Sequence, residues 1–325
     1  PLLVLIPLVP TMGKADLTMA RLGLIVGGAA FALFMAAELV TGQAFYRLTR
    51  GLDAAAVLDP NALNRPEVLA ALLVWPVAGA LWQTGRRRLA IAVPPLYAAA
   101  TLALTSQSTS LGMAAGLAVF GASLVAWRVV RWLLAAVVAA AFLFAVPAAH
   151  WLADGGLGEV GWLEFSAKHR IVIWDYVAER IQERPLFGWG LDASRVLNEA
   201  GGSLEGRPSV ELLPLHPHNA MLQVWLELGA YGAFIGLVFC LGLIGTVDRL
   251  PTTIRPFGAG LFATAMAIAS TAFGVWQSWW LAGIALAVLA MMILVHIEKA
   301  RRSRLSQAAF SQGGVVVGSR VASTR

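Results

Sequence analysis

Residues 219–245 read NAMLQVWLELGAYGAFIGLVFCLGLIG, and Glu227 is the only charged side chain among them. A helix needs roughly 20 predominantly apolar residues to cross the hydrocarbon core of a bilayer, so this stretch is long enough to span a membrane. The whole chain has the same character, because 58% of its 325 residues are hydrophobic and only 13% are charged. A soluble domain is about 25% charged, so most of this chain faces something other than water.

Further apolar runs of comparable length lie on both sides of this stretch. Hydropathy predicts them at about 22–41, 68–84, 89–105, 111–127, 132–149, 257–275 and 278–297. We therefore expect an all-α polytopic integral membrane protein with about 8 transmembrane helices and one large extracytoplasmic loop. The chain begins at Pro1 inside an apolar run, which we interpret as the end of a partial helix whose N-terminal neighbours are missing.

The positions of Lys and Arg predict the orientation. Every second loop is short and basic, and these loops hold Lys14, Arg21, Arg86, Arg87, Arg88, Arg128, Arg131, Arg249, Arg255, Lys299, Arg301, Arg302 and Arg304. Short basic loops stay in the cytoplasm, so the opposite loops are expected outside. The net charge of +6 is then a topology signal and does not indicate a nucleic-acid partner.

This orientation divides the chain into four regions. Residues 1–149 are the N-terminal transmembrane helices, 150–217 the large extracytoplasmic loop, 218–299 the C-terminal transmembrane helices and 300–325 a cytoplasmic tail.

His218 lies at the outer mouth of the span that begins at residue 219. On a helical wheel it shares one face with Leu222, Trp225, Gly229, Gly232 and Gly236. Small residues on a transmembrane face permit close helix packing, so this face is expected to point into the bundle. That position favours a functional imidazole over a structural one. Glu227 in the same span needs a partner, and Gln223 one turn earlier is the candidate.

Arg170 lies in a helix predicted between Ser166, a candidate N-cap, and Pro185. It shares the apolar face of that helix with Trp174, four residues further on. A charge on a docking face needs a partner. Two interpretations stay open, an ion pair with a carboxylate of the loop or a guanidinium that binds a phosphate.

Gly188 and Gly190 follow this helix closely and indicate a tight turn or a close backbone approach. A simple helix exit and a ligand-facing loop explain them equally well. Elsewhere the sequence shows no nucleotide-binding loop and no His, Cys or Asp cluster with metal-ligand spacing. We therefore expect neither a metal nor another cofactor.

The segment from His218 resembles the O-antigen ligase family, which also includes O-antigen and exopolysaccharide polymerases and protein O-oligosaccharyltransferases. The family pattern is a His followed by Asn, Ser or Gln, nine residues, then Gly and a second small residue. Here the pattern reads His218-Asn219, nine residues to Leu228, and then Gly229 and Gly232.

Two upstream segments are similar to the same family. Arg170-Ile-Val-Ile-Trp174, followed by Pro185-Leu-Phe-Gly-Trp-Gly190, looks like its Arg-x-x-x-Trp and Pro-x-x-Gly-x-Gly segments. Residues 61–66, Asn-Ala-Leu-Asn-Arg-Pro, are similar to its Asn-containing entry to a span. The similarity covers roughly residues 45–245. The family often has Ser-Arg in the short outer loop, whereas residues 106–110 read Ser-Gln-Ser-Thr-Ser and lack that second arginine.

The resemblance implies transfer of a glycan from a polyprenyl-diphosphate carrier to an acceptor hydroxyl at the periplasmic face of a bacterial inner membrane. His218 would act as general base or orient the acceptor, and Arg170 would neutralise the leaving diphosphate without a metal. The other residues assigned are Asn219, Trp174, Gly188 and Gly190 for substrate binding, Arg195, Arg65 and Arg47 as weaker phosphate candidates, and Gly229, Gly232 and Gly236 for helix packing.

Three activities compete. A ligase that uses lipid A-core as acceptor comes first, and a glycan polymerase or protein glycosyltransferase of the same family comes second. A transporter is the alternative of another class, but it would predict broken helices in two corresponding repeats, and the sequence shows no internal repeat.

Overall fold

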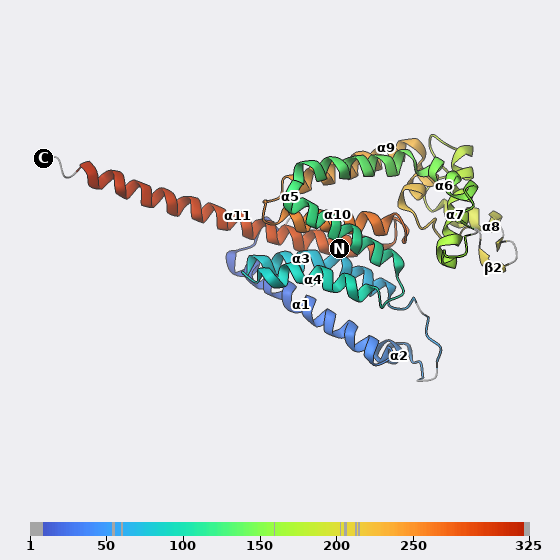
Figure 1. Cartoon of the computed structure of the whole chain (residues 1–325), viewed down its shortest axis with the longest axis horizontal. Coiled ribbons are helices and arrows are strands. Elements are labelled where there is room, and N and C mark those ends of the chain that lie inside the picture. Colours follow the sequence, from blue (N-terminus) through green and yellow to red (C-terminus); the bar gives the residue numbers. More distant parts are fainter. Residues whose placement is uncertain are drawn as a thin grey trace.

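The computed structural model describes residues 9–53, 56–59, 61–158, 160–201, 203–204, 207–211, 213 and 215–321. Figure 1 shows a bundle of long helices with most of the smaller elements gathered at one end, around α7 (Phe165–Glu183), whereas α2 (Ala44–Arg50) lies apart from them, next to α1. The bundle helices are α1 (Lys14–Val40), α3 (Asn64–Gln83), α4 (Arg87–Thr101), α5 (Gln107–Leu143), α9 (Ala220–Asp248), α10 (Arg255–Ala269) and α11 (Ser278–Val321). The smaller elements are α2 (Ala44–Arg50), α6 (Ala145–Asp154), α7 (Phe165–Glu183), α8 (Ala193–Gly201), β1 (Ser203–Leu204) and β2 (Arg207–Glu211).

Among the residues that the structure describes, five helices are long and apolar enough to cross a membrane: α1, α3, α5, α9 and the first part of α11, Ser278–Gln307. The chain is therefore a multi-pass membrane protein. Helices α4 and α10 have 15 residues each, fewer than the roughly 20 that a perpendicular span requires. The number of about 8 spans stays a prediction.

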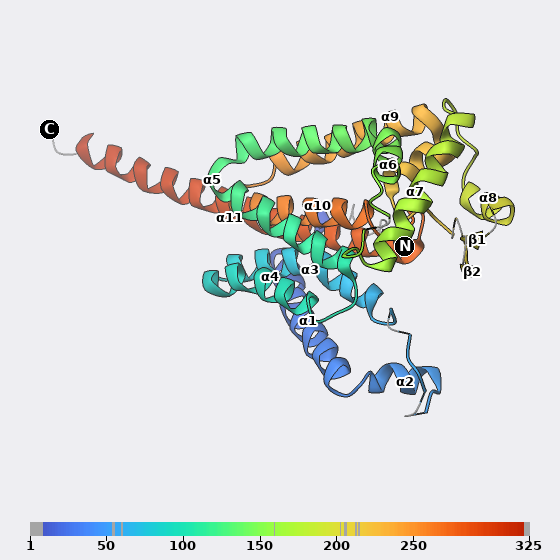
Figure 2. The same cartoon turned by 45° about the vertical axis from the view of Figure 1, so that its right-hand side comes forward.

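Helix α5 contains two arms that meet at Ala126, where φ −137° and ψ 53° leave the helical region. Figures 1 and 2 show the chain turning back there, so the arms match the two spans predicted at 111–127 and 132–149. The second arm ends at Leu143, and α6 begins as a separate helix at Ala145.

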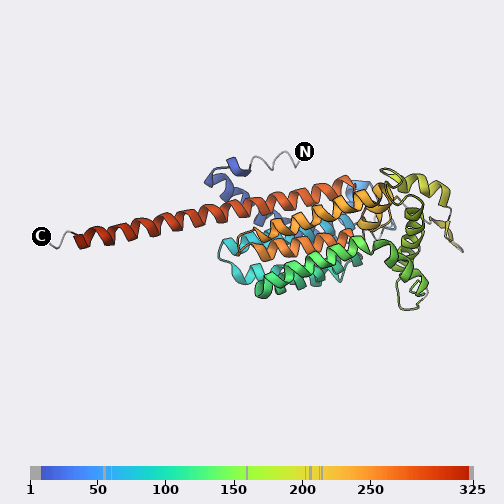
Figure 3. The same cartoon turned by 90° about the horizontal axis from the view of Figure 1, so that it is seen from above.

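The turn of α5 packs beside the last residue of α9. Trp127 Nε1 and Arg131 Nη1 donate to the two oxygens of Asp248 at 2.5 and 2.8 Å. This end of the bundle lies away from α7, and the loop between α3 and α4 lies there too (Figure 1). The loops predicted to be basic and cytoplasmic thus lie opposite α7. Seen from above in Figure 3, α11 continues well beyond the bundle at this end.

The bundle core forms around Trp75 of α3, which is fully buried. Its Nε1 donates to Thr264 Oγ1 of α10 at 2.9 Å. Gly116 of α5 and Gly260 of α10 lie against its ring, since a Cβ added to either would come within 2.6 Å of ring carbons. Two small residues thus allow three helices to close around one indole.

The helical fold is as expected, with one small antiparallel pair, β1 and β2, among the described residues. Two sequence expectations need correction. The N-cap of α7 is Glu164 and not Ser166, although the helix does end before Pro185 as expected. Helix α1 begins at Lys14 rather than near residue 22, because Asp16 accepts from the Gly13 N–H and caps the first turn. Hydropathy missed this turn because its charged side chains lower the mean hydropathy of the segment.

Candidate active site

The site lies at the α7 end of the bundle, where the chain enters α9. Asn219 is the N-cap of α9, and its Oδ1 accepts from Met221 N and Leu222 N at 3.0 and 3.2 Å. His218 precedes it with φ 56°, a left-handed conformation that few non-glycine residues adopt. The Asn219 oxygen expected to bind substrate is thus engaged by the helix, and it fixes the backbone from which His218 projects.

The imidazole of His218 points its Nδ1 at the carbonyl oxygen of Ala272, 2.5 Å away. A carbonyl oxygen only accepts hydrogen bonds, so Nδ1 carries the proton and Nε2 keeps a free lone pair. The His216 ring packs edge-on against it, with centroids 4.3 Å apart, and His216 Nδ1 accepts from the His218 backbone N–H at 3.3 Å. The Ala272 carbonyl therefore selects a single tautomer of His218, while the His216 ring packs against the imidazole.

Burial lowers the pKa of His218 from 6.5 to about 3, with smaller contributions in the same direction from His216, Arg170 and His169. The hydrogen bond to Ala272 opposes this shift. Burial and Arg170 likewise lower the pKa of His216 to about 4. Both imidazoles are neutral at pH 7.

Arg170 lines a mostly apolar cavity of about 330 Å³, in which the other polar lining residues are Gln107, Ser108 and Thr271. Burial lowers the pKa of its guanidinium. None of the salt bridges among the described side chains involves Arg170. Of the two interpretations left open by the sequence, the described residues supply no carboxylate partner for the first.

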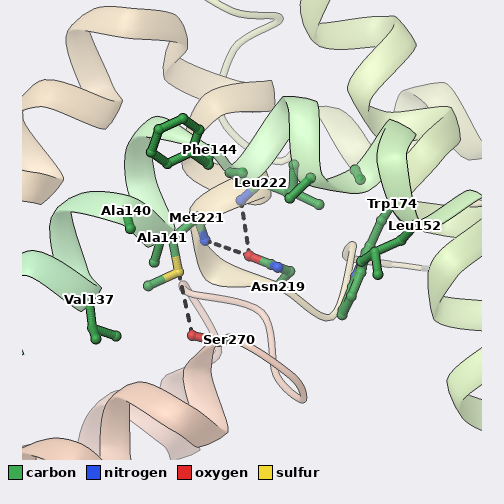
Figure 4. A pocket seen from close by; sticks show the side chains of 13 residues that line it. Val137, Ala140, Ala141, Phe144, Leu152, Trp174, Asn219, Met221, Leu222 and Ser270 are labelled. Carbon is green, nitrogen blue, oxygen red and sulfur yellow. Dashed lines mark hydrogen bonds between the residues drawn. The ribbon is translucent and has the colours of Figure 1, made fainter. Parts of the chain in front are cut away.

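Trp174 separates this cavity from a second one of about 350 Å³. Its Nε1 donates to the Pro217 carbonyl at 2.9 Å, which ties α7 to the His216–His218 segment. Figure 4 shows the second cavity, where Trp174 and Asn219 face alanines of α5. The cavity that holds Arg170 and the second cavity thus meet at one indole.

Gly188 and Gly190 lie against the middle of α9. Trp189 N donates to Leu226 O at 2.8 Å, Gly190 N to Glu227 O at 2.9 Å, and Ala230 N to Pro185 O at 2.8 Å. This contact is the close backbone approach that the two glycines indicated, and their assignment to substrate binding stays a prediction.

Gly229 interrupts α9 at the same place, with φ 63° and ψ −158°. A Cβ on Gly229 would lie 2.4 Å from the Leu186 carbonyl, and one on Gly188 would lie 2.5 Å from the Glu227 backbone. The single helical wheel drawn through Gly229 therefore does not hold. Beyond the break, Gly236 packs on α5, where its Cβ would meet Phe142 at 2.9 Å, and Gly232 is buried.

The partner expected for Glu227 is confirmed, because Gln223 Nε2 donates to Glu227 Oε1 at 2.9 Å. A second partner was not foreseen. Trp276 Nε1 donates to Glu227 Oε2 at 2.5 Å from the loop between α10 and α11. No residue-type pattern indicates a contact between positions so far apart.

The weaker arginine candidates have other partners. Arg195 forms an exposed salt bridge with Asp192 at 2.7 Å. Arg65 is exposed and lies 5.6 Å from the ring of Trp279. Arg47 donates to the backbone oxygens of Gly42, Asp53 and Ala56.

The short loop that lacks the family arginine contributes to the site in another way. Ser106 caps α5, Ser108 Oγ donates to Thr271 O at 3.0 Å, and Gln107 lines the cavity of Arg170. Within the described part of the chain, no group of three His, Cys, Asp or Glu side chains could hold a metal ion.

Fold and site together define a multi-pass membrane protein with a half-buried histidine and a cavity lined by an arginine at one end of its bundle. Residues 89–239 match the family profile described as O-Antigen ligase, which confirms the resemblance found in the motifs. Proteins named "Putative polysaccharide ligase" from Rickettsia prowazekii and Rickettsia typhi are each 34% identical over 134 residues, 40% of this chain and 33% of theirs. The Rickettsia conorii protein of that name is 30% identical over 133 residues, 40% of this chain and 32% of its own.

The chain thus matches about a third of the length of these curated relatives. No solved structure matches the chain.

Proposed function

We propose that this protein is a membrane glycosyltransferase that moves a glycan from a polyprenyl-diphosphate carrier to an acceptor hydroxyl on the periplasmic side of a bacterial inner membrane. Its first-choice acceptor is lipid A-core, which makes it an O-antigen ligase. One observation carries the proposal: Ala272 holds His218 Nδ1, and the preceding residue Thr271 lines a cavity with Arg170, for which the described residues supply no carboxylate partner.

The chemistry needs two groups, and the site offers both. The acceptor oxygen forms a bond to the anomeric carbon while the bond from that carbon to the diphosphate oxygen breaks. The acceptor proton passes to His218 Nε2, and Arg170 neutralises the charge that develops on the leaving diphosphate. The fork of a guanidinium suits two phosphate oxygens, and its partial burial strengthens that interaction.

The low pKa of His218 fits this sequence of events. Before substrate binds, burial and the nearby Arg170 keep the imidazole neutral and ready to accept a proton. A bound diphosphate adds negative charge beside both groups and stabilises the imidazolium once it forms. Substrate binding therefore raises the basicity of His218 at the step that uses it.

The test is glycan transfer by the full-length protein in reconstituted membranes. A lipid-linked glycan is offered with lipid A-core, with glycan repeat units and with a pilin-type protein in turn. Transfer to lipid A-core supports the ligase, and transfer only to one of the others assigns a polymerase or a protein glycosyltransferase of the same family.

His218→Ala is expected to lower transfer by about 100-fold or more at an unchanged protein level, because general base catalysis contributes about 10²–10⁴. His296→Ala is the matched control, since its Nδ1 also donates to a backbone carbonyl, that of Met292, at 2.9 Å within α11. Normal transfer by the His218 variant would remove this residue from the mechanism.

A further inference from the structure

The loop between α10 and α11, residues 270–277, forms one wall of the site. Thr271 O accepts from Ser108 Oγ at 3.0 Å, and Ala272 O accepts from His218 Nδ1 at 2.5 Å. Gly274 lies against His216, since a Cβ built on it would come within 3.1 Å of the ring. Both imidazoles thus rest on a stretch of irregular backbone whose position determines theirs.

Two buried side chains of α9 hold the far end of this loop. Glu227 is fully buried, and its two oxygens accept from Trp276 Nε1 at 2.5 Å and from Gln223 Nε2 at 2.9 Å. Gln223, 4% exposed, completes the arrangement because its Oε1 accepts from Val275 N at 2.9 Å. These contacts fasten two consecutive residues of the loop to one turn of α9.

We propose that Glu227 is a positioning residue for His218, and that the clamp of Glu227, Gln223 and Trp276 fixes the loop whose Ala272 carbonyl orients the imidazole. The role in catalysis rests on the proposed function, whereas the clamp itself is a property of the structure. Glu227 acts through the loop and touches neither His218 nor the reacting atoms in this scheme.

The donor pattern explains why a carboxyl group is needed. Trp276 offers one N–H and Gln223 offers an NH₂, so the residue between them must accept twice. An amide at position 227 has one oxygen and one NH₂, and one donor would then face another donor. Rotating the Gln223 amide does not help, because its oxygen would leave the Val275 N–H unpaired.

Loosening the clamp should change the environment of His218 in a defined direction. Its pKa is low mainly because it is buried, and His216, Arg170 and His169 lower it further. A displaced loop admits water and weakens the hydrogen bond to Ala272. Relief of burial is the larger effect, so the pKa of His218 should rise toward 6.5.

The first measurement needs no substrate. Diethyl pyrocarbonate modifies accessible neutral imidazoles, and tandem mass spectrometry reports the rate at His218 separately from His216. We expect Glu227→Gln and Trp276→Phe each to raise the rate at His218 by about tenfold, the factor that accompanies loss of one buried hydrogen bond. Trp127→Phe is the matched control, because it deletes an indole N–H that donates to the carboxylate of Asp248 at the opposite end of the bundle.

The second measurement is the pH dependence of kcat/KM for glycan transfer. In Glu227→Gln and Trp276→Phe, the acid limb should move toward neutral pH by about one unit or more, whereas Trp127→Phe should keep the limb of the wild-type protein. A mere loss of folded protein lowers the rate at every pH and leaves the limb in place.

The outcomes separate the two proposals. Labelling of both clamp variants at the control rate, or faster labelling with an unmoved acid limb, overturns the positioning role of Glu227. A wild-type protein that transfers no glycan overturns the proposed function, and the labelling rates then still decide whether the clamp holds His218.

Discussion

His218 adopts a left-handed backbone conformation that costs a non-glycine residue of order 1–3 kcal/mol. Its neighbours hold it there. Asn219 caps α9 directly after it, Trp174 binds the Pro217 carbonyl before it, and Ala272 accepts from its ring. A strained backbone conformation that three neighbouring contacts maintain is characteristic of a residue whose placement matters for function.

The pH dependence of transfer should show the low pKa of His218. Since kcat/KM reports the free protein, its acid limb should lie below about pH 5, because the imidazole stays neutral down to a pKa of about 3. The acid limb of kcat reports the complex and should lie at higher pH, since a bound diphosphate stabilises the imidazolium. Both limbs are measured with the reconstituted protein, and a kcat/KM limb near 6.5 would contradict the burial of His218.

Arg170 can be tested by separating charge from shape. A lysine keeps the charge but cannot form a bidentate contact, so Arg170→Lys should lose most transfer and Arg170→Ala about 100-fold or more. Activity is measured per folded molecule. Arg180→Lys is the control on the same helix, because Arg180 pairs with Glu183 at 2.6 Å. Near-normal specific activity in Arg170→Ala would turn attention to Arg195 or Arg65.

Some of the site could be predicted residue by residue. The pair Gln223 and Glu227 follows from helical spacing, and the place of His218 follows from the start of an apolar run. The partners from the 270–277 loop could not be predicted. The acceptor for His218 is the backbone carbonyl of Ala272, and because every residue has such a carbonyl, residue type does not indicate which one accepts the hydrogen bond.

At the level of elements, the two glycine motifs form a single contact. The Gly188–Gly190 segment and the Gly229 segment appear as separate patterns in the sequence, yet their backbones hydrogen-bond to each other. Hydropathy predicted α9 as one helix because Glu227 is the only charged residue within 219–245 and a single glycine does not end an apolar run. The break depends on a loop distant in sequence, so local patterns could not reveal it.

Gly229→Ala should therefore detach the loop from α9. The new Cβ would meet the Leu186 carbonyl at 2.4 Å, and φ 63° with ψ −158° is a backbone region essentially restricted to glycine, which costs a residue with a side chain about 1–3 kcal/mol. We expect faster proteolysis within residues 185–190 and a loss of transfer of about tenfold or more. Gly242→Ala, on the same helix with open space around it, is the control and should behave like the wild-type protein. Equal behaviour of the two variants would show that the docked loop is not required.

At the scale of the whole molecule, the prediction concerns its orientation in the membrane, with the large loop outside and the basic loops in the cytoplasm. Cysteine placed at Val196 in the large loop should react with an impermeant maleimide in intact spheroplasts, whereas cysteine at Arg87 should react only after permeabilisation. The parent protein supplies the background, since its single Cys240 is buried. The reverse pattern would place the site in the cytoplasm and overturn the proposed function.

Hydropathy located the helices of the bundle, because apolar length is a local property of the sequence. It misplaced their ends, as at α1 and at the second arm of α5, because capping and kinks depend on single side chains. The convergence of α7, α9 and the 270–277 loop on His218 depends on the tertiary arrangement, which local patterns do not encode.

The docking of residues 185–190 on α9 also has a consequence for the order of biosynthesis. Trp189 and Gly190 donate to Leu226 and Glu227, which leave the ribosome later. The large loop therefore cannot reach its final conformation until α9 has been translated and inserted. Until then the backbone amides of residues 185–190 hydrogen-bond to water. The final folding of this half of the protein therefore depends on α9, a helix that is synthesised after the loop.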